Sequence, residues 1–356
     1  MSEDDKQKGR TGRKMNRRSA MKTFGVAAGT LAFPYGTISS SLSDEYTGEK
    51  VLRQASPKKP LTPSEALALQ REAIQRFKDK TGSTDIFGSV APSDDSDIVS
   101  LGFQIGPKTG ASVYMGTVPK GSDLSQGTLG KRRSKAAEHV QQAKAANRSY
   151  SGTVAASDPG GSTVSGFDTD VASYYIDYDD EPSGSLYDGG VVYEKSVSDE
   201  WFYGIDHVHR PNPGANAFSG SSVKLAESSC HHKWGAFDAG SITPHDYYPD
   251  SNDNGNFTVD GGIGVPLGAT IGVSYDPPNV YRNVQGTPNG TDDFRWNWEH
   301  PTLTGQDHTF RPVSAARSYD RATSGISASN RLFELYSMGE WNDREVTTRS
   351  IYVYVD

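Results

Sequence analysis

The order of hydrophobic and polar residues changes character along this 356-residue chain. Within residues 61–82, apolar positions recur every three or four residues, a spacing typical of an amphipathic helix. From residue 167 onward, β-branched and aromatic residues alternate with polar ones between Gly, Pro, Asn and Asp, which predicts many short strands. The chain is therefore expected to be mainly β, with a small α+β region at residues 61–148 before a β region at residues 167–356.

The helix within residues 61–82 has clear start and stop signals. Thr62 suits the N-cap position, and Pro63 suits the first helical position. Glu65 lies three residues after Thr62, where the acid of a capping box accepts a hydrogen bond from the N-cap amide. Gly82 suits the end of the helix. One face is apolar and is formed by Leu69, Ala73, Ile74 and Phe77.

Two strands and a second helix complete the small α+β region. The segments 98–105 and 111–118 are separated by glycines and a proline, which predicts a hairpin. The helix expected at residues 131–147 begins with the basic run 131–135. Such a run indicates either a solvated helix start or a processing site.

Many strands with no helix between them predict an antiparallel β-sandwich over residues 167–356. The polar segments 41–60 and 149–166 are interpreted as linkers, and the second, rich in Gly and Ser, as a domain boundary. The expected strands are residues 171–178, 189–196, 201–209, 233–237, 257–275, 293–298, 309–315, 332–336 and 346–355.

Strict alternation over residues 257–275 is the clearest single pattern. The odd positions are apolar or glycine, and Pro266, Leu267 and Gly268 suit a three-residue loop with a type I turn followed by a left-handed residue. In the resulting register all the apolar side chains share one face. This register pairs Val259 with Tyr275, Gly261 with Val273, Ile263 with Ile271 and Val265 with Ala269.

This hairpin has two interpretations. It is either an ordinary sandwich hairpin with one face in the core, or a membrane-inserting hairpin. Each arm has about nine residues, near the length of a tilted transmembrane strand, and Gly, Thr and Ser on the other face suit an aqueous lumen. In the membrane interpretation Leu267 leads insertion. Trp296 and Trp298, which share one face of another strand, are further candidate membrane or surface contacts.

Two histidines form a candidate zinc site. His207 and His209 project from the same face of an expected strand about 7 Å apart, close enough to share a metal ion. A third ligand would come from Cys230, His231, His232 or His245.

A second candidate metal site resembles the first half of a calcium loop. Asp250, Asn252 and Asn254 offer oxygen ligands at positions one, three and five, Gly255 permits the sharp turn, and Asn256 offers its carbonyl group. The acid expected at position twelve is missing, so a solvated Asn/Asp turn is the alternative.

Four acids at residues 177–181 are a weaker signal. Asp177, Asp179, Asp180 and Glu181 could hold a glycosidase-like pair, but a solvated acidic loop is the preferred interpretation.

The N-terminus carries Arg17, Arg18 and Lys22, followed by an apolar run that ends at Pro34 and is too short to span a bilayer. These residues resemble a twin-arginine (Tat) export signal, which would occupy residues 1–40. The resemblance implies that the Tat translocase is a partner and that the protein is secreted.

The charge agrees with an extracellular role. From residue 46 onward the chain has 28 basic and 39 acidic residues, a net charge of −11, which favours solubility in high salt and argues against nucleic-acid binding. The single cysteine excludes an intramolecular disulfide. In being acidic, of similar length and Tat-exported, the chain resembles haloarchaeal secreted proteins such as halocins.

The sequence thus predicts a secreted, non-enzymatic β-sandwich protein that binds an envelope surface, a glycan or a target-cell membrane, with a halocin-like toxin as one version. The alternative is a secreted metal-dependent hydrolase that uses His207 and His209. Calcium and zinc are the candidate cofactors.

Overall fold

The structure is a computed structural model of the chain. It describes residues 46–122, 125–149, 161–234, 242–250, 253–255, 259–275, 280–286, 293–321, 331–342 and 345–355. All of these residues belong to one compact unit, Ile38–Asp356. The residues of the predicted export signal lie outside the described residues, so that prediction remains untested.

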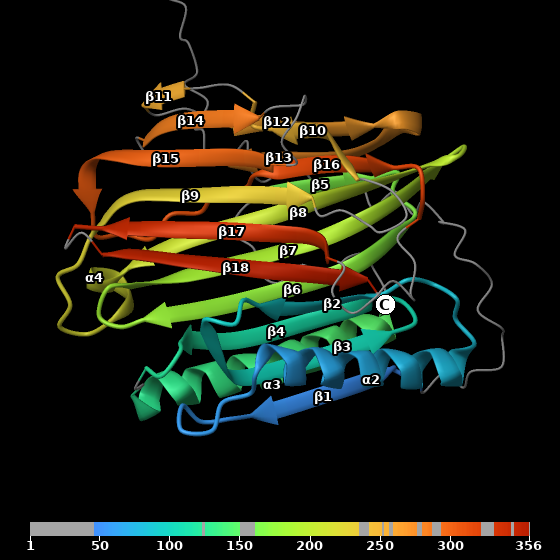
Figure 1. Ribbon diagram of the computed structural model, residues 1–356, viewed down its shortest axis with the longest axis horizontal. Coiled ribbons are helices and arrows are strands. Elements are labelled where there is room, and N and C mark those ends of the chain that lie inside the picture. Colours follow the sequence, from blue (N-terminus) through green and yellow to red (C-terminus); the bar gives the residue numbers. More distant parts are fainter. Residues whose placement is uncertain are drawn as a thin grey trace, which may run out of the picture. The chain divides into compact units, whose positions relative to one another are not determined.

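Three β-sheets make up most of the described chain (Figure 1). The first has, in spatial order, strands β1 (Glu49–Gln54), β3 (Ser96–Gly106), β4 (Gly110–Pro119), β6 (Thr169–Asp180), β7 (Gly184–Val197), β8 (Glu200–Pro213), β16 (Val313–Ser318) and β10 (Thr243–Tyr248). The second has β11 (Asp253–Gly255), β14 (Val280–Gly286), β15 (Asp293–Thr304), β9 (Leu225–Trp234), β17 (Arg331–Trp341), β18 (Val346–Val355) and β2 (Gly88–Pro92). The third has β12 (Val259–Val265), β13 (Ala269–Tyr275) and β5 (Gly161–Ser165).

The predicted β-sandwich is confirmed. The first and second sheets pack face to face, and large side chains from both are fully buried between them. Alternation along each strand produces this core, because every second side chain points to the same face. Core side chains include Tyr174, Ile205, Trp234, Trp298 and Phe333.

Helix α2 (Pro63–Thr81) has the predicted boundaries. The Thr62 side chain accepts a hydrogen bond from the Glu65 amide, the Glu65 carboxylate accepts one from the Thr62 amide at 2.8 Å, and Gly82 ends the helix in the left-handed conformation. These interactions satisfy amides and a carbonyl that a helix end leaves without partners.

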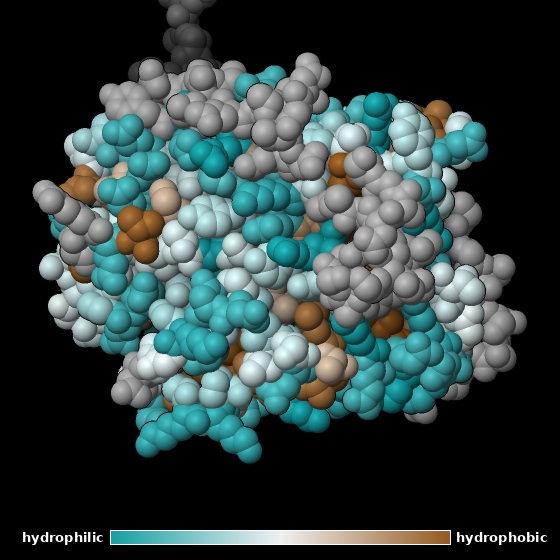
Figure 2. All heavy atoms as spheres, viewed as in Figure 1, coloured by the Kyte–Doolittle hydropathy of each residue, from teal (hydrophilic) through white to brown (hydrophobic). Residues whose placement is uncertain are grey.

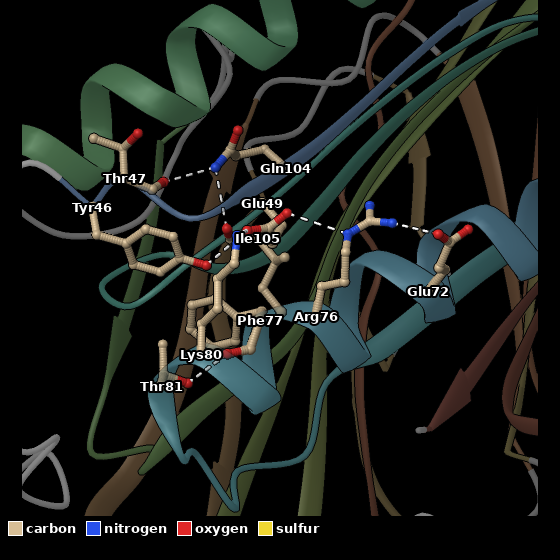
Figure 3. A network of polar contacts seen from close by, with 10 residues as sticks. All are labelled: Tyr46, Thr47, Glu49, Glu72, Arg76, Phe77, Lys80, Thr81, Gln104 and Ile105. Carbon is tan, nitrogen blue, oxygen red and sulfur yellow. Dashed lines mark hydrogen bonds and ion pairs between the residues drawn. The ribbon is translucent and has the colours of Figure 1, made fainter.

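Ion pairs join α2 to β1, a strand that lies within the predicted linker 41–60 (Figure 3). The Glu49 carboxylate contacts Lys80 at 2.6 Å and Arg76 at 3.4 Å, and Tyr46 donates a hydrogen bond to it at 3.0 Å. A strand therefore forms in this segment because β3 supplies its hydrogen bonds and α2 supplies charges for its side chains.

Helix α3 (Gln126–Ser149) covers one face of the first sheet. Glycines in β3 and β4 let it come close, since a Cβ at Gly102 would lie 2.4 Å from the Ala136 carbonyl oxygen. The helix begins at Gln126, before the predicted start at residue 131, so the basic run 131–135 lies inside it. This run is not solvated throughout, because Arg132 is buried and paired with Asp177 and Asp179 of β6. Lys135 also contacts Asp177, at 2.6 Å.

The small α+β region and the C-terminal region contribute to the same sheet. Strand β4 pairs with β6 in parallel, so β1, β3 and β4 continue the sheet formed by β6, β7 and β8. Part of the predicted linker 149–166 is also a strand, β5, which pairs with β13. The segment between α3 and β5 therefore does not divide the sheet.

Few large apolar side chains are exposed in the described chain. On the face seen in Figure 2, hydrophilic residues predominate and hydrophobic ones form small separate groups. The exposed large hydrophobic residues are Leu52, Leu267, Leu303, Tyr319 and Val346. None of the described helices has the length and apolar character needed to cross a membrane.

Candidate functional site

A cluster of polar side chains lies between the two large sheets and is sealed from solvent. His207 and His209 of β8 point from the first sheet, as predicted, and Cys230 and His232 of β9 point toward them from the second. Asp188 of β7 stands opposite His209 in the strand pairing. His207, His209, Cys230, His232 and Asp188 are all 0% exposed.

The buried Asp188 carboxylate accepts three hydrogen bonds. Its Oδ1 atom lies 3.3 Å from His207 Nε2 and 2.9 Å from His209 Nδ1, and Ser337 Oγ of β17 donates to its Oδ2 at 2.7 Å. Three donors on a carboxylate stabilise its charged form where no water can. Burial alone would raise the pKa of Asp188, but the bonds from His207 and His209 hold it well below its usual range.

The other side of the cluster connects His207 to β9. His207 Nδ1 lies 3.0 Å from His232 Nε2 and 3.3 Å from Cys230 Sγ. His232 Nδ1 lies 2.9 Å from Ser314 Oγ, which also accepts a hydrogen bond from Trp234 Nε1 at 3.1 Å. Burial lowers the pKa of both His207 and His232, which favours the neutral form of each imidazole.

These contacts revise the predicted histidine pair. His207 Nδ1 contacts both Cys230 and His232. One potential ligand atom from each of these three residues lies within 4.8 Å of the others. His209 contacts Asp188 through Nδ1, and its Nε2 atom is buried without a hydrogen-bond partner. The residues grouped with His207 are therefore Cys230 and His232, two of the predicted third-ligand candidates, and both lie on strand β9.

Substrate access decides what such a cluster could do chemically. A hydrolytic metal ion keeps one coordination position open to water and substrate. His207 and His209 are both fully buried. The geometry therefore suits a structural role and gives no support to the hydrolase alternative.

The hairpin β12–β13 has the predicted register. Val259 pairs with Tyr275, Ile263 with Ile271 and Val265 with Ala269. The turn differs from the expected type I form, because Leu267 as well as Gly268 adopts a left-handed backbone, with φ of 61° and 77°. A left-handed conformation costs a leucine about 1–2 kcal/mol, since its Cβ crowds the following carbonyl.

The two faces of this hairpin have opposite environments. The apolar side chains Ile263 and Ile271 are 2% and 0% exposed, whereas Thr270 and Ser274 on the other face are exposed. The apolar face lies against β8, β10 and β16. The contact is close at Gly204 of β8, where a Cβ would lie 2.9 Å from Ile271 Cδ1.

Several other predicted contacts are corrected by the structure. Trp296 and Trp298 do share a face, but it is the core face, and both are 0% exposed, so neither can contact a membrane, a sugar or a surface. The predicted acidic loop is in part strand, because Asp177 and Asp179 lie in β6 and bind Arg132. These tryptophans and acids therefore contribute to packing and ion pairing.

The predicted calcium loop is only partly described. Asn254 lies in β11, paired with Tyr281 of β14, and Asp250 ends the segment that follows β10. Asn252 and Asn256 lie outside the described residues, so calcium binding remains a prediction.

Comparisons with known proteins assign no family. No family model matches the chain, and no curated protein does. Among solved structures, similarity is found to a pore-forming protein, with a TM-score of 0.27 and 9% identity over 55% of this chain and 94% of that one. It is also found to the Clostridium perfringens NetB toxin in the membrane-inserted form, with a TM-score of 0.23, 7% identity and the same coverages. Scores this low establish neither a shared fold nor a shared function.

Proposed function

We propose that this protein is secreted through the Tat pathway and acts without catalysis on a target membrane, into which it inserts the β12–β13 hairpin. The observation that carries the proposal is that this hairpin has one wholly apolar face, and that it belongs to a small sheet of its own. Among the described strands, none of this third sheet pairs with either large sheet. The hairpin could therefore leave without breaking the ladders of the sandwich.

The composition of the two faces supports insertion. A strand in a membrane barrel presents apolar side chains to lipid and polar or small ones to the lumen, in strict alternation. In the hairpin, Ile263, Val265, Ile271 and Val273 alternate with Gly, Thr and Ser. An ordinary core hairpin needs the apolar face, but it does not need the other face to be small. In β12 and β13 that other face has Asp260 as its one charged residue, and from Gly262 to Ser274 it has only Gly, Thr and Ser.

The length of the hairpin indicates how many copies would be needed. Seven described residues in each arm extend about 23 Å at roughly 3.3 Å per residue, and two more in each arm would match a tilted membrane strand. A spanning sheet must close on itself, and the smallest natural barrels have about eight strands. One hairpin per chain then requires at least about four copies.

The tip supports the same function. Leu267 is 76% exposed, and its left-handed backbone is unfavourable for leucine. Neither packing nor backbone preference favours a leucine there, because glycine or asparagine would suit the turn better. An apolar tip is useful when it is the first part to enter a bilayer.

A disulfide that holds the hairpin in place tests the proposal. Ser165 of β5 and Thr270 of β13 are cross-strand partners whose hydroxyl oxygens lie 3.0 Å apart on the exposed face. Cysteines at both positions are expected to join β13 to β5 when oxidised. Release of dye from phosphatidylcholine vesicles, in concentrated salt to screen the acidic surface, should be lost on oxidation and restored by reduction.

A second disulfide is the matched control. Gly264 of β12 is the cross-strand partner of Thr270 on the same exposed face, and a side chain at Gly264 meets open space. Cysteines at residues 264 and 270 would join the two arms of the hairpin but leave β5 free, so release should persist. Equal dye release from the oxidised and reduced forms of the Ser165/Thr270 variant would contradict the proposal, as would the absence of release by the unmodified protein.

A further inference from the structure

We propose that the sandwich core binds one Zn²⁺ ion through His207 Nδ1, Cys230 Sγ and His232 Nε2, and that the ion joins the two large sheets. His207 belongs to the first sheet, and Cys230 and His232 belong to the second. Two imidazole nitrogens and one thiolate are typical zinc ligands. No part of this proposal depends on membrane insertion.

The two distances from His207 Nδ1 are slightly shorter than those between ligand atoms of a tetrahedral zinc site. Zinc at about 2.05 Å from nitrogen and 2.3 Å from sulfur, in tetrahedral geometry, places two nitrogens about 3.3 Å apart and a nitrogen and a sulfur about 3.5 Å apart. The corresponding distances are 3.0 Å between His207 and His232 and 3.3 Å between His207 and Cys230. These two distances would lengthen by only a few tenths of an ångström around the ion, and the ligand atoms of Cys230 and His232 lie within 4.8 Å of each other.

The neighbours of the histidines already orient them for a metal. His207 Nε2 lies 3.3 Å from Asp188 Oδ1, the carboxylate partner that fixes the tautomer of many metal-binding histidines and leaves Nδ1 as the ligand. His232 Nδ1 lies 2.9 Å from Ser314 Oγ and would donate to it, which leaves Nε2 as the ligand. Each ligating nitrogen thus has its opposite nitrogen held by a hydrogen bond.

The charge of the cluster also favours a divalent cation. Without an ion, Asp188 carries the one negative charge among these five side chains, in a place where charge is costly. Zinc would displace the thiol proton of Cys230 to solvent, and His232 would move its proton from Nε2 to Nδ1. The two positive charges of zinc then balance the negative charges of the Cys230 thiolate and the Asp188 carboxylate.

Metal analysis and cobalt spectroscopy of the full chain test this site. After incubation with zinc and removal of excess ion, we expect one equivalent of zinc per chain, and a chelator should lower the melting temperature by several degrees until zinc is restored. In protein loaded with Co²⁺ instead, a thiolate-to-cobalt charge-transfer band should appear. That band tests Cys230 ligation without any substitution, and so does not depend on a variant that folds.

Substitutions locate the ligands. Cys230→Ser and His232→Ala should each lose the ion and the cobalt band. His231→Ala is the matched control, because His231 lies between them on β9 but points to the other face, where its ring lies 4.9 Å from that of Tyr336. A folded wild-type chain that retains no zinc and melts at the same temperature with or without it would overturn the proposal, as would zinc retained in full by Cys230→Ser.

Discussion

Replacing Ile263 with Asp would place a carboxyl group between the hairpin and the sandwich. Ile263 is 2% exposed and stands opposite Ile271, which is 0% exposed. Loss of the isoleucine burial removes about 2–3 kcal/mol of stability. Burial of the new carboxyl group in neutral form, with its pKa raised by about 3, costs roughly a further 4 kcal/mol at neutral pH. The full cost of the docked variant is therefore roughly 6 kcal/mol.

The Ile263→Asp substitution cannot destabilise the protein by more than the free energy with which the hairpin docks on the sandwich, because the hairpin can undock instead. Its four large aliphatic side chains contribute roughly 8 kcal/mol at about 2 kcal/mol each, before the entropy of ordering the segment is subtracted. The cost of the substitution is thus comparable to the whole gain from docking. Since the third sheet shares no described strand pairing with the two large ones, we expect the hairpin of Ile263→Asp to undock while the sandwich stays folded.

Hydrogen exchange resolved by peptide, with a thermal melt and a vesicle assay, checks this expectation. Residues 259–275 should lose protection and the rest of the protein should keep it, while vesicle leakage should fall because an acid would face lipid. Thr270→Asp is the control, since Thr270 lies on the exposed face of the same hairpin and should keep protection. Unfolding of the whole domain would show that the hairpin is part of the cooperative core, and unchanged protection would show that the register is wrong.

Two further predictions concern stability and chain connection. Burial lowers the pKa of His139, which lies 2.9 Å from Ser112, to about 4, so the unfolded chain binds more protons between pH 6.5 and 4. Stability should therefore fall by about 3 kcal/mol as the pH is lowered through this window, and denaturant titrations of His139→Gln should show a smaller fall. Cleavage within residues 150–160 should leave two fragments that elute together in size-exclusion chromatography, because β4 pairs with β6; separate elution would show that the regions are independent domains.

The elements that could be predicted from sequence are those whose signals are local. Thr62, Glu65 and Gly82 act within one helix turn of their partners, so the boundaries of α2 follow from residue types alone. The pairing of β12 with β13 is equally local, since a three-residue loop fixes which residues stand opposite one another. Only the turn conformation differed, because Leu267 adopts a backbone that leucine rarely has.

The features that sequence could not supply depend on contacts between distant segments. Strand β1 is polar and forms because β3 and α2 lie beside it, and the parallel pairing of β4 with β6 joins segments about 60 residues apart. Alternation placed Trp296 and Trp298 on one face, but it cannot show whether that face meets the core or solvent. Spacing likewise paired His207 with His209, whereas the sandwich brings His207 to a different strand, β9.

Strand β8 lies between the hairpin and the candidate zinc site, because its two faces contact different parts of the protein. Gly204 faces the hairpin, and a Cβ there would lie 2.8 Å from Phe167 Cζ as well as 2.9 Å from Ile271 Cδ1. His207, three residues along, faces the second sheet and contacts His232. Residues three apart on a strand point to opposite faces, so neither set of contacts blocks the other. Under the two proposals, a metal ion on one side would hold β8 against the second sheet while the hairpin left the other side, so the part proposed to stay folded is separate from the part proposed to move.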